Sequence, residues 1–545
     1  MRVHRLALPC ALAALFALPM LAALALAAQA GLDGDAWRAL WADPQWPRAL
    51  ALSVWVALAS TALALAGALG LTTALHGSPA WQRLARWLGP MLALPHAAFA
   101  IGFGLLVMPS GLVARLLAPL AGWASPPDWG TVNDRWGFGL VAVLAAKELP
   151  FLLWNIFALF GRPEVEADLQ RQIGVVRTLG YDRRAAWWRV LWPQWLPRLA
   201  LPLAAVFAYS LTVVDLALII GPASPPTLAV LAWQWLRDAD PARNAQGAVT
   251  VLALAGVLGL LCALGAALAL AARRAWLARV RLGHRPREPA ARSALAGGLA
   301  RALVGLYATV LAMIVAMSVA GVWTFPALWP QVWTTAAWAS VAEAAGTVGF
   351  TAGLALAASA SALLMVVVWL EATPAAWDHR AAPLLMAPIV LPGLLLMVGL
   401  YRGALHLGLD GARLGLWWAH TLVVVPYVFV ALAPAWRSFD VRYEWTALAL
   451  GGTRLAFWWR VKWPLLLAPL AAAAAVGFAV SVAQYLPTQF VGAGRHATVT
   501  TEAVTLASGG QRTLAAAFAL LQALLPALGF GIGHALAQWQ RRRLP

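Results

Sequence analysis

The sequence predicts an all-α polytopic membrane protein of about twelve transmembrane helices, arranged as two parallel repeats of six. The 545 residues are 62% hydrophobic and 11% charged, and the mean hydropathy is +0.76, whereas about 25% of a soluble domain is charged. Apolar runs of roughly 20 residues recur along the chain, and this length crosses a bilayer as a helix. Helices also satisfy their own backbone hydrogen bonds in lipid. The third observation is an internal repeat.

The first half is expected over residues 1–272. Its six spans are expected at about 6–28, 50–75, 88–108, 137–160, 198–220 and 248–272. The first run follows basic residues and ends in Ala28-Gln29-Ala30, so it has features of a signal peptide. It is, however, longer than the roughly 7–15 residues of a signal core. We therefore expect a retained first helix.

A basic linker over 273–297 is expected to join the halves, because it contains Pro286 and Pro289 and shows no apolar helical face. The second half is expected over 298–545. Its spans are expected at about 299–320, 341–370, 383–400, 414–436, 465–490 and 514–537.

The distribution of basic residues predicts the orientation. With the N-terminus in the cytoplasm, most of the 39 Lys and Arg residues fall in cytoplasmic segments, as the positive-inside rule requires. An even number of spans in each half gives both halves the same orientation. We therefore expect both termini in the cytoplasm. The net charge of +18 is then a topology signal, and we expect no nucleic-acid partner.

The repeat is clearest in two basic segments. The first loop, about 161–197, contains Gly180, Trp187-Trp188-Arg189-Val190 and Pro193. The second loop, about 437–465, contains Gly451, Trp458-Trp459-Arg460-Val461 and Pro464. The offset is 271 residues (451 − 180 and 464 − 193), and it also pairs Phe207, Ser210, Gly221 and Thr227 with Phe478, Ser481, Gly492 and Thr498. Upstream, Pro90 and Pro95 share their spacing of five with Pro383 and Pro388. Duplicated helical halves predict a pathway between them.

The repeated loops allow two interpretations. Each glycine suits a turn with positive φ, and the residues that follow can form a short helix ended by Pro193 or Pro464. Such a helix can lie in the membrane interface, with Trp among the headgroups and Arg on phosphate. Alternatively, two similar loops can dock two copies of one partner. Spacing alone leaves both open.

These loops resemble the EAA loop of ABC-transporter permeases, in which a glycine is followed by nine residues, an aliphatic residue, two residues and a proline. Val190 and Val461 occupy the aliphatic position, but Gly174-Val175-Val176 and Trp445-Thr446-Ala447 replace the Glu-Ala-Ala of that family. Two such loops in one chain resemble the fused permeases of binding-protein-dependent importers of the iron(III) and thiamine type. Residues 214–217, 221–228 and 484–488 resemble an uncharacterised, thiamine-like group of these permeases.

The resemblance implies that each loop couples the permease to a cytoplasmic ATPase subunit, with a pair of identical subunits in all. The residues expected in this coupling are Gly180, Asp182, Trp188, Arg189, Pro193, Gly451, Trp459, Arg460 and Pro464. A phosphate-binding P-loop needs Gly-Lys, and the two lysines, Lys147 and Lys462, follow Ala146 and Val461. ATP therefore belongs to the partner, and we expect no cofactor on this chain. A periplasmic solute-binding protein and the lipid bilayer are the other expected partners, and the resemblance implies a location in the bacterial inner membrane.

Ionisable and polar groups inside spans are candidates for the translocation pathway. They are Asp215, Gln484, Tyr485, Thr488, Gln489, Lys147 and Glu148. The alternative is hydrogen bonding between helices, which for Lys147 and Glu148 takes the form of pairing with other helices.

The sequence contains no catalytic or metal-ligand motif, and His96, His406, His420 and His534 stand isolated. We therefore expect a non-enzymatic transport subunit that moves a small solute. The competing function is an ion-coupled secondary transporter with duplicated six-helix halves.

Overall fold

The computed structural model describes residues 3–281 and 293–542, and these residues form helices and no β-strand apart from one isolated bridge between Ala320 and Trp333. The all-α fold expected from the composition is therefore confirmed. The described residues divide into two compact units. Unit 1 takes those of Met1–Leu32, Met317–Val322 and Gln331–Pro545, and unit 2 takes those of Asp33–Ala316 and Trp323–Pro330.

Unit 2 is built on helices of the first half. They are α2 (Gly34–Ala42), α3 (Trp46–Leu75), α4 (Pro79–Ala93), α5 (His96–Val107), α6 (Leu112–Ala121), α7 (Phe138–Phe160), α8 (Pro163–Thr178), α9 (Arg183–Ala186), η1 (Trp187–Leu191), α10 (Trp192–Trp195), η2 (Leu196–Leu199), α11 (Ala200–Thr212), α12 (Asp215–Ile220), α13 (Leu228–Leu236) and α14 (Pro241–Arg281), joined by α15 (Ser293–Ser318) as far as Ala316.

Helix α7 packs against α3, α4 and α5 in this unit. Its start is fixed by the Asp134 carboxylate, which accepts hydrogen bonds from the backbone N–H groups of Phe138 (2.9 Å) and Gly139 (3.1 Å). These donors have no partner within the helix. The Ser53 hydroxyl accepts a bond from Leu228 N–H at 2.8 Å and so ties α13 to α3.

Unit 1 is built on helices of the second half. They are α1 (Val3–Ala30), α16 (Ala336–Glu343), α17 (Ala345–Ala372), α18 (Ala376–Leu385), α19 (Ala387–Val390), α20 (Gly393–His406), α21 (Arg413–Arg437), α22 (Arg442–Ala449), α23 (Arg454–Phe457), η3 (Trp458–Lys462), α24 (Trp463–Val482), α25 (Leu486–Phe490), α26 (Val499–Ser508) and α27 (Arg512–Arg541).

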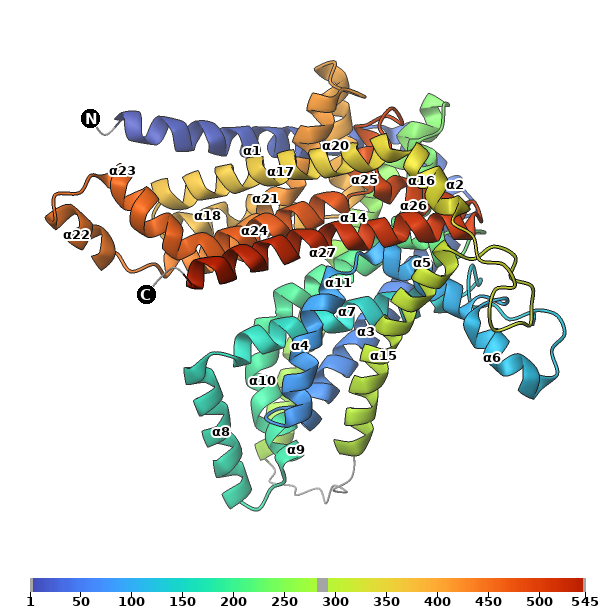
Figure 1. Cartoon of the computed structure of the whole chain (residues 1–545), viewed down its shortest axis with the longest axis horizontal. Coiled ribbons are helices and arrows are strands. Elements are labelled where there is room, and N and C mark those ends of the chain that lie inside the picture. The colour runs from blue at the N-terminus through green and yellow to red at the C-terminus, as the bar shows by residue number, and fades with distance from the viewer. Residues whose placement is uncertain (1–2, 282–292, 543–545) are drawn as a thin grey trace. The chain divides into compact units, whose positions relative to one another are not determined.

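Helices α17, α21, α24 and α27 form the bundle of unit 1, with α1 beside α17 and α20 (Figure 1). The Thr351 hydroxyl accepts a bond from Val499 N–H at 3.0 Å. This repeats the Ser53–Leu228 contact of unit 2, since Val499 follows Leu228 by 271 residues (499 − 228). The repeat inferred from the loops therefore extends to packing contacts.

The first helix of each half packs with the other half. Gly399 on α20 lies against the backbone of Ala23 on α1, where a side chain would collide with the Ala23 carbonyl. Gly102 on α5 lies in the same way against α15, where an added Cβ would be 2.7 Å from Val310 and 2.8 Å from Ile314. The linker at 273–297 separates the two sequence repeats, but it does not separate the two compact units. Helix α1 of the first half belongs to unit 1, and most of α15 of the second half belongs to unit 2.

Eleven helices of the described chain are long and apolar enough to cross a membrane, which agrees with about twelve expected spans. The expected span 383–400 is missing from this set, because it is broken into α18, α19 and α20. The expected span 88–108 is likewise broken between α4 and α5.

Two details of the structure differ from the sequence pattern. Helix α14 continues through Arg281, so the start of the expected linker is helical, while residues 282–292 lie outside the described chain. In the structure, Pro95 precedes α5 and Pro392 precedes α20, so these two prolines are equivalent, with an offset of 297 (392 − 95). The sequence spacing had paired Pro95 with Pro388, but Pro388 lies inside α19.

Candidate functional site

The two loops have the same backbone turn at their glycines. The φ angle is +81° at Gly180 and +80° at Gly451, a region that L side chains rarely adopt. A Cβ at either position would meet no atom within 4 Å. The glycine is therefore needed for the backbone conformation and not for space, as the spacing predicts.

A short capped helix follows each glycine. The Asp182 carboxylate accepts a hydrogen bond from Ala185 N–H at 2.7 Å and begins α9. The Thr453 hydroxyl accepts one from Ala456 N–H at 3.1 Å and begins α23. Asp and Thr are favoured at this position because their oxygen satisfies a free N–H in the first turn.

The prolines do not end these helices, contrary to the expectation from sequence. Each helix widens into a π turn, Trp187–Leu191 in the first loop and Trp458–Lys462 in the second, and then continues in α10 or α24. Trp192 N–H donates to Trp187 O, and Trp463 N–H donates to Trp458 O. A proline has no N–H and clashes with the carbonyl four residues earlier, and the wider turn before it accommodates both effects.

Aromatic and imidazole groups attach the first loop to the end of α3. Trp187 is fully buried, and Trp192 Nε1 donates to the Thr73 hydroxyl at 2.9 Å. Arg183 donates to the carbonyl of His76, whose Nε2 is 3.1 Å from Glu166 Oε2 on α8. Burial lowers the pKa of His76, and the nearby Glu166 carboxylate partly opposes this shift.

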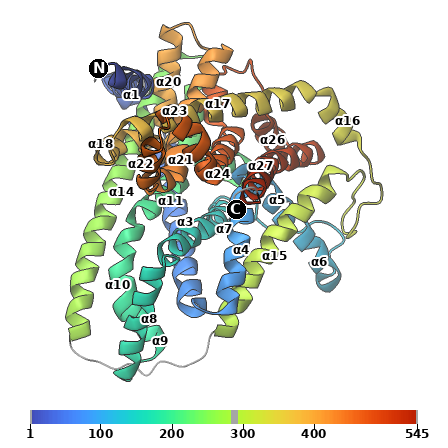
Figure 2. The same cartoon turned by 60° about the vertical axis from the view of Figure 1, so that its left-hand side comes forward.

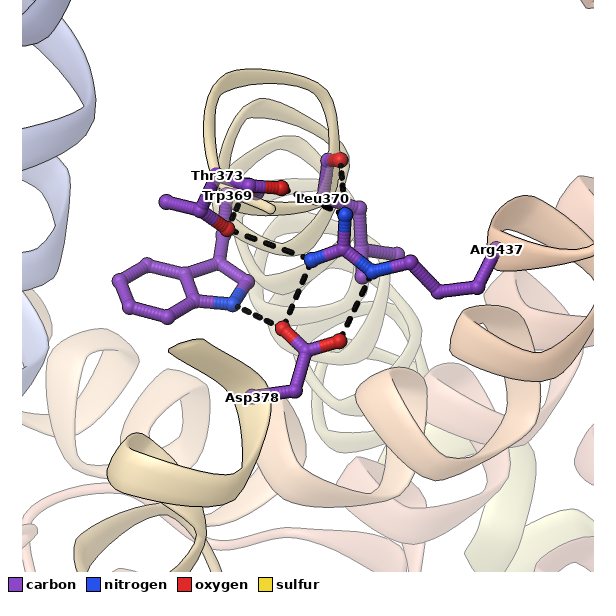
Figure 3. A network of polar contacts seen from close by, with 5 residues as sticks. All are labelled: Trp369, Leu370, Thr373, Asp378 and Arg437. Atoms are coloured by element: carbon purple, nitrogen blue, oxygen red, sulfur yellow. Dashed lines mark hydrogen bonds and ion pairs between the residues drawn. The ribbon is translucent and has the colours of Figure 1, made fainter. Parts of the chain in front are cut away.

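The start of the second loop is held instead by an ion pair with Asp378 on α18 and by hydrogen bonds to the end of α17 (Figure 3). The Arg437 guanidinium donates to both carboxylate oxygens of Asp378, at 2.8 and 2.7 Å. It also donates to Leu370 O at 2.9 Å, to Thr373 O at 2.6 Å and to the Thr373 hydroxyl at 3.2 Å. Trp369 Nε1 donates to the same carboxylate at 2.9 Å. All five guanidinium donors are therefore used.

A second ion pair closes the other end of this loop. Lys462, in the π turn, is buried and pairs with Glu371 on α17. Its ammonium also lies 4.5 Å from the ring centroid of Trp436, a favourable cation–π distance. Residues 438–461 are thus bracketed by Arg437 and Lys462.

The side chains expected to couple lie on the surface of both loops. Trp188 and Trp459 are exposed, and so is Arg460. Arg189 is partly exposed and lies over the ring of Tyr181 at 5.4 Å. Their contact with an ATPase stays a prediction.

The pathway candidates of unit 2 gather at two helix breaks. Helix α5 begins after Pro95, and α12 begins with Asp215 after a break at Val213 and Val214. The two helices pack together. Asp215 thus starts a short helix, whereas the sequence had placed it deep in one continuous span.

His96 is a site residue that the sequence analysis missed. Its Nε2 is 3.3 Å from Glu148 Oε1, its ring is 4.9 Å from the Tyr209 ring, and Asp215 lies within its electrostatic range. Glu148 is buried, while the imidazole is partly exposed. The available signal was its place directly after Pro95.

Lys147 is bound by backbone carbonyls and aromatic rings. Its ammonium donates to Met91 O at 3.1 Å and to Leu94 O at 2.7 Å, which are carbonyls at the end of α4. The rings of Phe99 and Tyr307 lie on it at 5.7 and 5.5 Å. These contacts are those of helix pairing, and a pathway role for Lys147 stays a prediction.

Unit 1 repeats the two breaks with neutral side chains. Helix α20 begins after Pro392, and α24 ends before Gln484 and Tyr485. Thr488 is buried and bonds to His420 Nε2 at 3.1 Å, whose Nδ1 bonds to Ser481 at 2.9 Å. Gln484 and Gln489 are partly exposed, and Tyr485 is buried.

Within the described residues, no group of three His, Cys, Asp or Glu side chains could hold a metal ion. Two repeated bundles, each with a surface loop and a pair of broken helices, define a polytopic membrane transport protein. Broken helices are typical of transporter binding sites.

Comparison with known proteins identifies the family. The chain is 38% identical over 509 residues to the inner membrane ABC transporter permease protein YnjC of Escherichia coli (strain K12), covering 92% of this chain and 90% of that protein. A shorter stretch of 115 residues is 30% identical to the molybdenum transport system permease protein ModB of Mycobacterium tuberculosis (strain ATCC 25618 / H37Rv) and of Mycobacterium bovis (strain ATCC BAA-935 / AF2122/97), covering 19% of this chain and 44% of each relative. No family model matches the chain. The chain belongs to the family of ABC transporter permeases.

Proposed function

We propose that this permease imports a small solute with energy from ATP that a separate pair of identical cytoplasmic ATPase subunits hydrolyses. The observation that carries the proposal is the duplicated loop. Gly180 and Gly451 have the same left-handed φ, and a capped helix, a π turn and a proline follow each in the same order. Two surfaces with one backbone shape suit two copies of one partner.

The contacts at the loop ends supply a route for force. A pull on the first loop reaches α3 through Trp192 and Thr73, and a pull on the second reaches α17 through Lys462 and Glu371. Helices α3 and α17 pack against α7 and α21. Closure of the ATPase pair would then move these helices, because packed helices shift as rigid elements.

The helix breaks are the proposed solute pathway. Asp215 and Glu148, together with His96, supply ionisable groups in unit 2, while Gln484 and Gln489 supply amides in unit 1. The solute would reach them from a periplasmic binding protein, with both termini in the cytoplasm. The ModB match covers only 19% of the chain, so its molybdenum is not carried over, and a thiamine-like solute stays a prediction.

Reconstitution tests this proposal. A tagged permease should co-purify with an ATPase subunit from the cells that produce it. In proteoliposomes, solute uptake should require that subunit and ATP, and hydrolysis should rise when the binding protein and solute are added. Uptake that continues without the ATPase and stops with an uncoupler would instead establish an ion-coupled secondary transporter.

A further inference from the structure

The two loops share a backbone but present different surfaces. Three exposed positions change character between them at the offset of 271 residues (445 − 174, 448 − 177 and 455 − 184). The first loop has Gly174, Arg177 and Arg184, and the second has Trp445, Leu448 and Leu455. The two loops therefore share the glycine, the two tryptophans and the proline but differ at these three exposed positions.

The second loop exposes an unusual amount of apolar surface. Trp445 is 61% exposed, Leu448 39% and Leu455 69%. In all, residues 441–459 expose seven large apolar side chains, whereas the equivalent residues 170–188 expose three. The seven are Val441, Tyr443, Trp445, Leu448, Leu450, Leu455 and Trp459. Large apolar side chains exposed together on one short segment are typical of a protein or membrane interface.

Two of the three exposed arginines in residues 438–461 pair with carboxylates of the same loop, and the third is Arg460. Arg442 pairs with Asp440 at 2.6 Å, and Arg454 pairs with Glu444 at 3.1 Å. An interfacial membrane helix needs basic side chains that reach lipid phosphate, and these two arginines are already bound to carboxylates. The second loop also projects past the ends of α21 and α24 (Figure 1). Both observations favour a protein partner for this surface.

The first loop is basic where the second is apolar. Arg177 lies within electrostatic range of Arg183, and Arg184 follows Arg183 on α9. Figure 2 shows α9 beside α8. Residues 177–184 contain three arginines and one aspartate, so the segment around Gly180 has a net positive charge. Salt screens interactions between exposed charges, but it does not weaken apolar burial in the same way.

We propose that the two loops hold their ATPase subunits by different forces, the second loop by apolar burial and the first by charge. This inference rests on the proposed function, since the occupant of each loop is one ATPase subunit. Two identical ATPase subunits would then bind two loops with different surfaces through the same groove. The contact at the second loop then persists in high salt, whereas the contact at the first loop is released.

The test uses the full-length permease in nanodiscs and the ATPase subunit with which it co-purifies. Binding is measured at 50 and 500 mM NaCl for the wild type, Leu448→Arg/Leu455→Arg and Arg177→Leu/Arg184→Leu. Leu407→Arg is the matched control, because Leu407 is 74% exposed in the same unit but outside both loops. The melting temperature of each variant confirms that it is folded.

We expect the wild type to keep one ATPase subunit per permease at 500 mM salt. Leu448→Arg/Leu455→Arg should weaken that binding by about tenfold or more, and Arg177→Leu/Arg184→Leu should reduce the salt dependence. Leu407→Arg should behave like the wild type.

The failures are distinguishable. A wild type that binds no ATPase in either salt contradicts the proposed function itself. If the wild type binds the ATPase and both loop variants bind it with the affinity and salt dependence of the wild type, only the inference about unlike loops is overturned. Repeating the measurement in lipid-free amphipol decides between protein and membrane. If the defect of Leu448→Arg/Leu455→Arg disappears there, the apolar surface belongs to the lipid and the inference is wrong.

Discussion

Gly180 and Gly451 have backbone φ angles of +81° and +80° although they are 271 residues apart (451 − 180). Neither glycine is crowded, since an added Cβ would meet no atom within 4 Å. The shared feature of the two loops is therefore a left-handed backbone turn that places a capped helix after it.

Substitution of both glycines by alanine should uncouple transport from ATP hydrolysis. Each Gly→Ala change places an L residue at positive φ, which costs about 1–2 kcal/mol, and the turn can relieve this cost by shifting α9 or α23. Solute uptake should fall while ATP hydrolysis continues. Uptake and hydrolysis are both measured in proteoliposomes.

Gly256→Ala is the matched control for this change. Gly256 lies within α14, outside both loops, and an added Cβ would also meet no atom within 4 Å. Alanine is favoured over glycine by about 0.5–1 kcal/mol within a helix, so transport should be unchanged. Normal coupling in the double variant Gly180→Ala/Gly451→Ala would count against a coupling role for the turns.

The glycine turns were predictable because their chemistry is local. A glycine at fixed distance from a proline constrains the backbone wherever it occurs, so Gly180 and Pro193 indicated both the turn and the repeat. The π turn was not predictable in the same way. The sequence shows that a proline disturbs the helix before Pro193, but it does not show whether the helix ends there or widens and continues into α10.

Features that depend on distant residues were missed. His96 seemed isolated because its partner, Glu148, is 52 residues away. The helix break at Val213 and Val214 could not be predicted, because no glycine or proline lies at these positions. Glycine and proline are the usual sequence signals of a helix break. The exchange of first helices depends on Gly102 and Gly399, which are ordinary small residues within apolar runs.

Arg437→Lys should destabilise the end of α21. A lysine cannot reproduce the two parallel bonds to Asp378 or reach Leu370 O and Thr373 O at the same time, and the pair is largely buried, with side chains 21% and 17% exposed. Loss of these bonds should cost about 1–3 kcal/mol. The measurement is the melting temperature in detergent.

Arg442→Lys provides the comparison for Arg437→Lys. Arg442 also pairs with an aspartate, Asp440, but its side chain is 79% exposed, and exposed pairs contribute little. Its melting temperature should match the wild type. Equal melting temperatures for all three proteins would show that the Arg437 network does not stabilise the fold.

Acidification should loosen the first loop through His76. Burial lowers the pKa of His76 in the folded protein, so the unfolded chain binds a proton first as the pH falls through the ordinary value of about 6.5. Stability that is present above this pH is then lost, with a slope of at most about 1.4 kcal/mol per pH unit. Hydrogen exchange in α8 and α9, corrected for intrinsic rates, should show faster opening at pH 5.5 than at pH 7.5.

His76→Gln removes the titrating imidazole and should remove this pH dependence. The glutamine amide can still donate to Glu166, which is 3.1 Å from the imidazole in the wild type. The same acceleration in His76→Gln would assign the effect to another group, and slower opening at pH 5.5 in the wild type would contradict the expected direction of the pH effect.

Lys147 and Glu148 are neighbours in sequence, but their substitutions should have different effects. Lys147→Met removes the donor to Met91 O and Leu94 O, and each buried carbonyl left without a partner costs about 1–3 kcal/mol. We therefore expect a lower melting temperature. Glu148→Gln keeps a polar group opposite His96, at 3.3 Å in the wild type, so it should melt like the wild type but transport at least about tenfold more slowly.

Asp215→Asn should behave like Glu148→Gln, because it removes charge at the second break without changing side-chain size. The three variants are compared by melting temperature and by initial uptake rate in proteoliposomes at the same ATPase occupancy. Wild-type uptake in both Glu148→Gln and Asp215→Asn would remove these carboxylates from the pathway. A stable Lys147→Met variant with slow uptake would instead place the ammonium in the pathway, against the helix-pairing role that its contacts with α4 support.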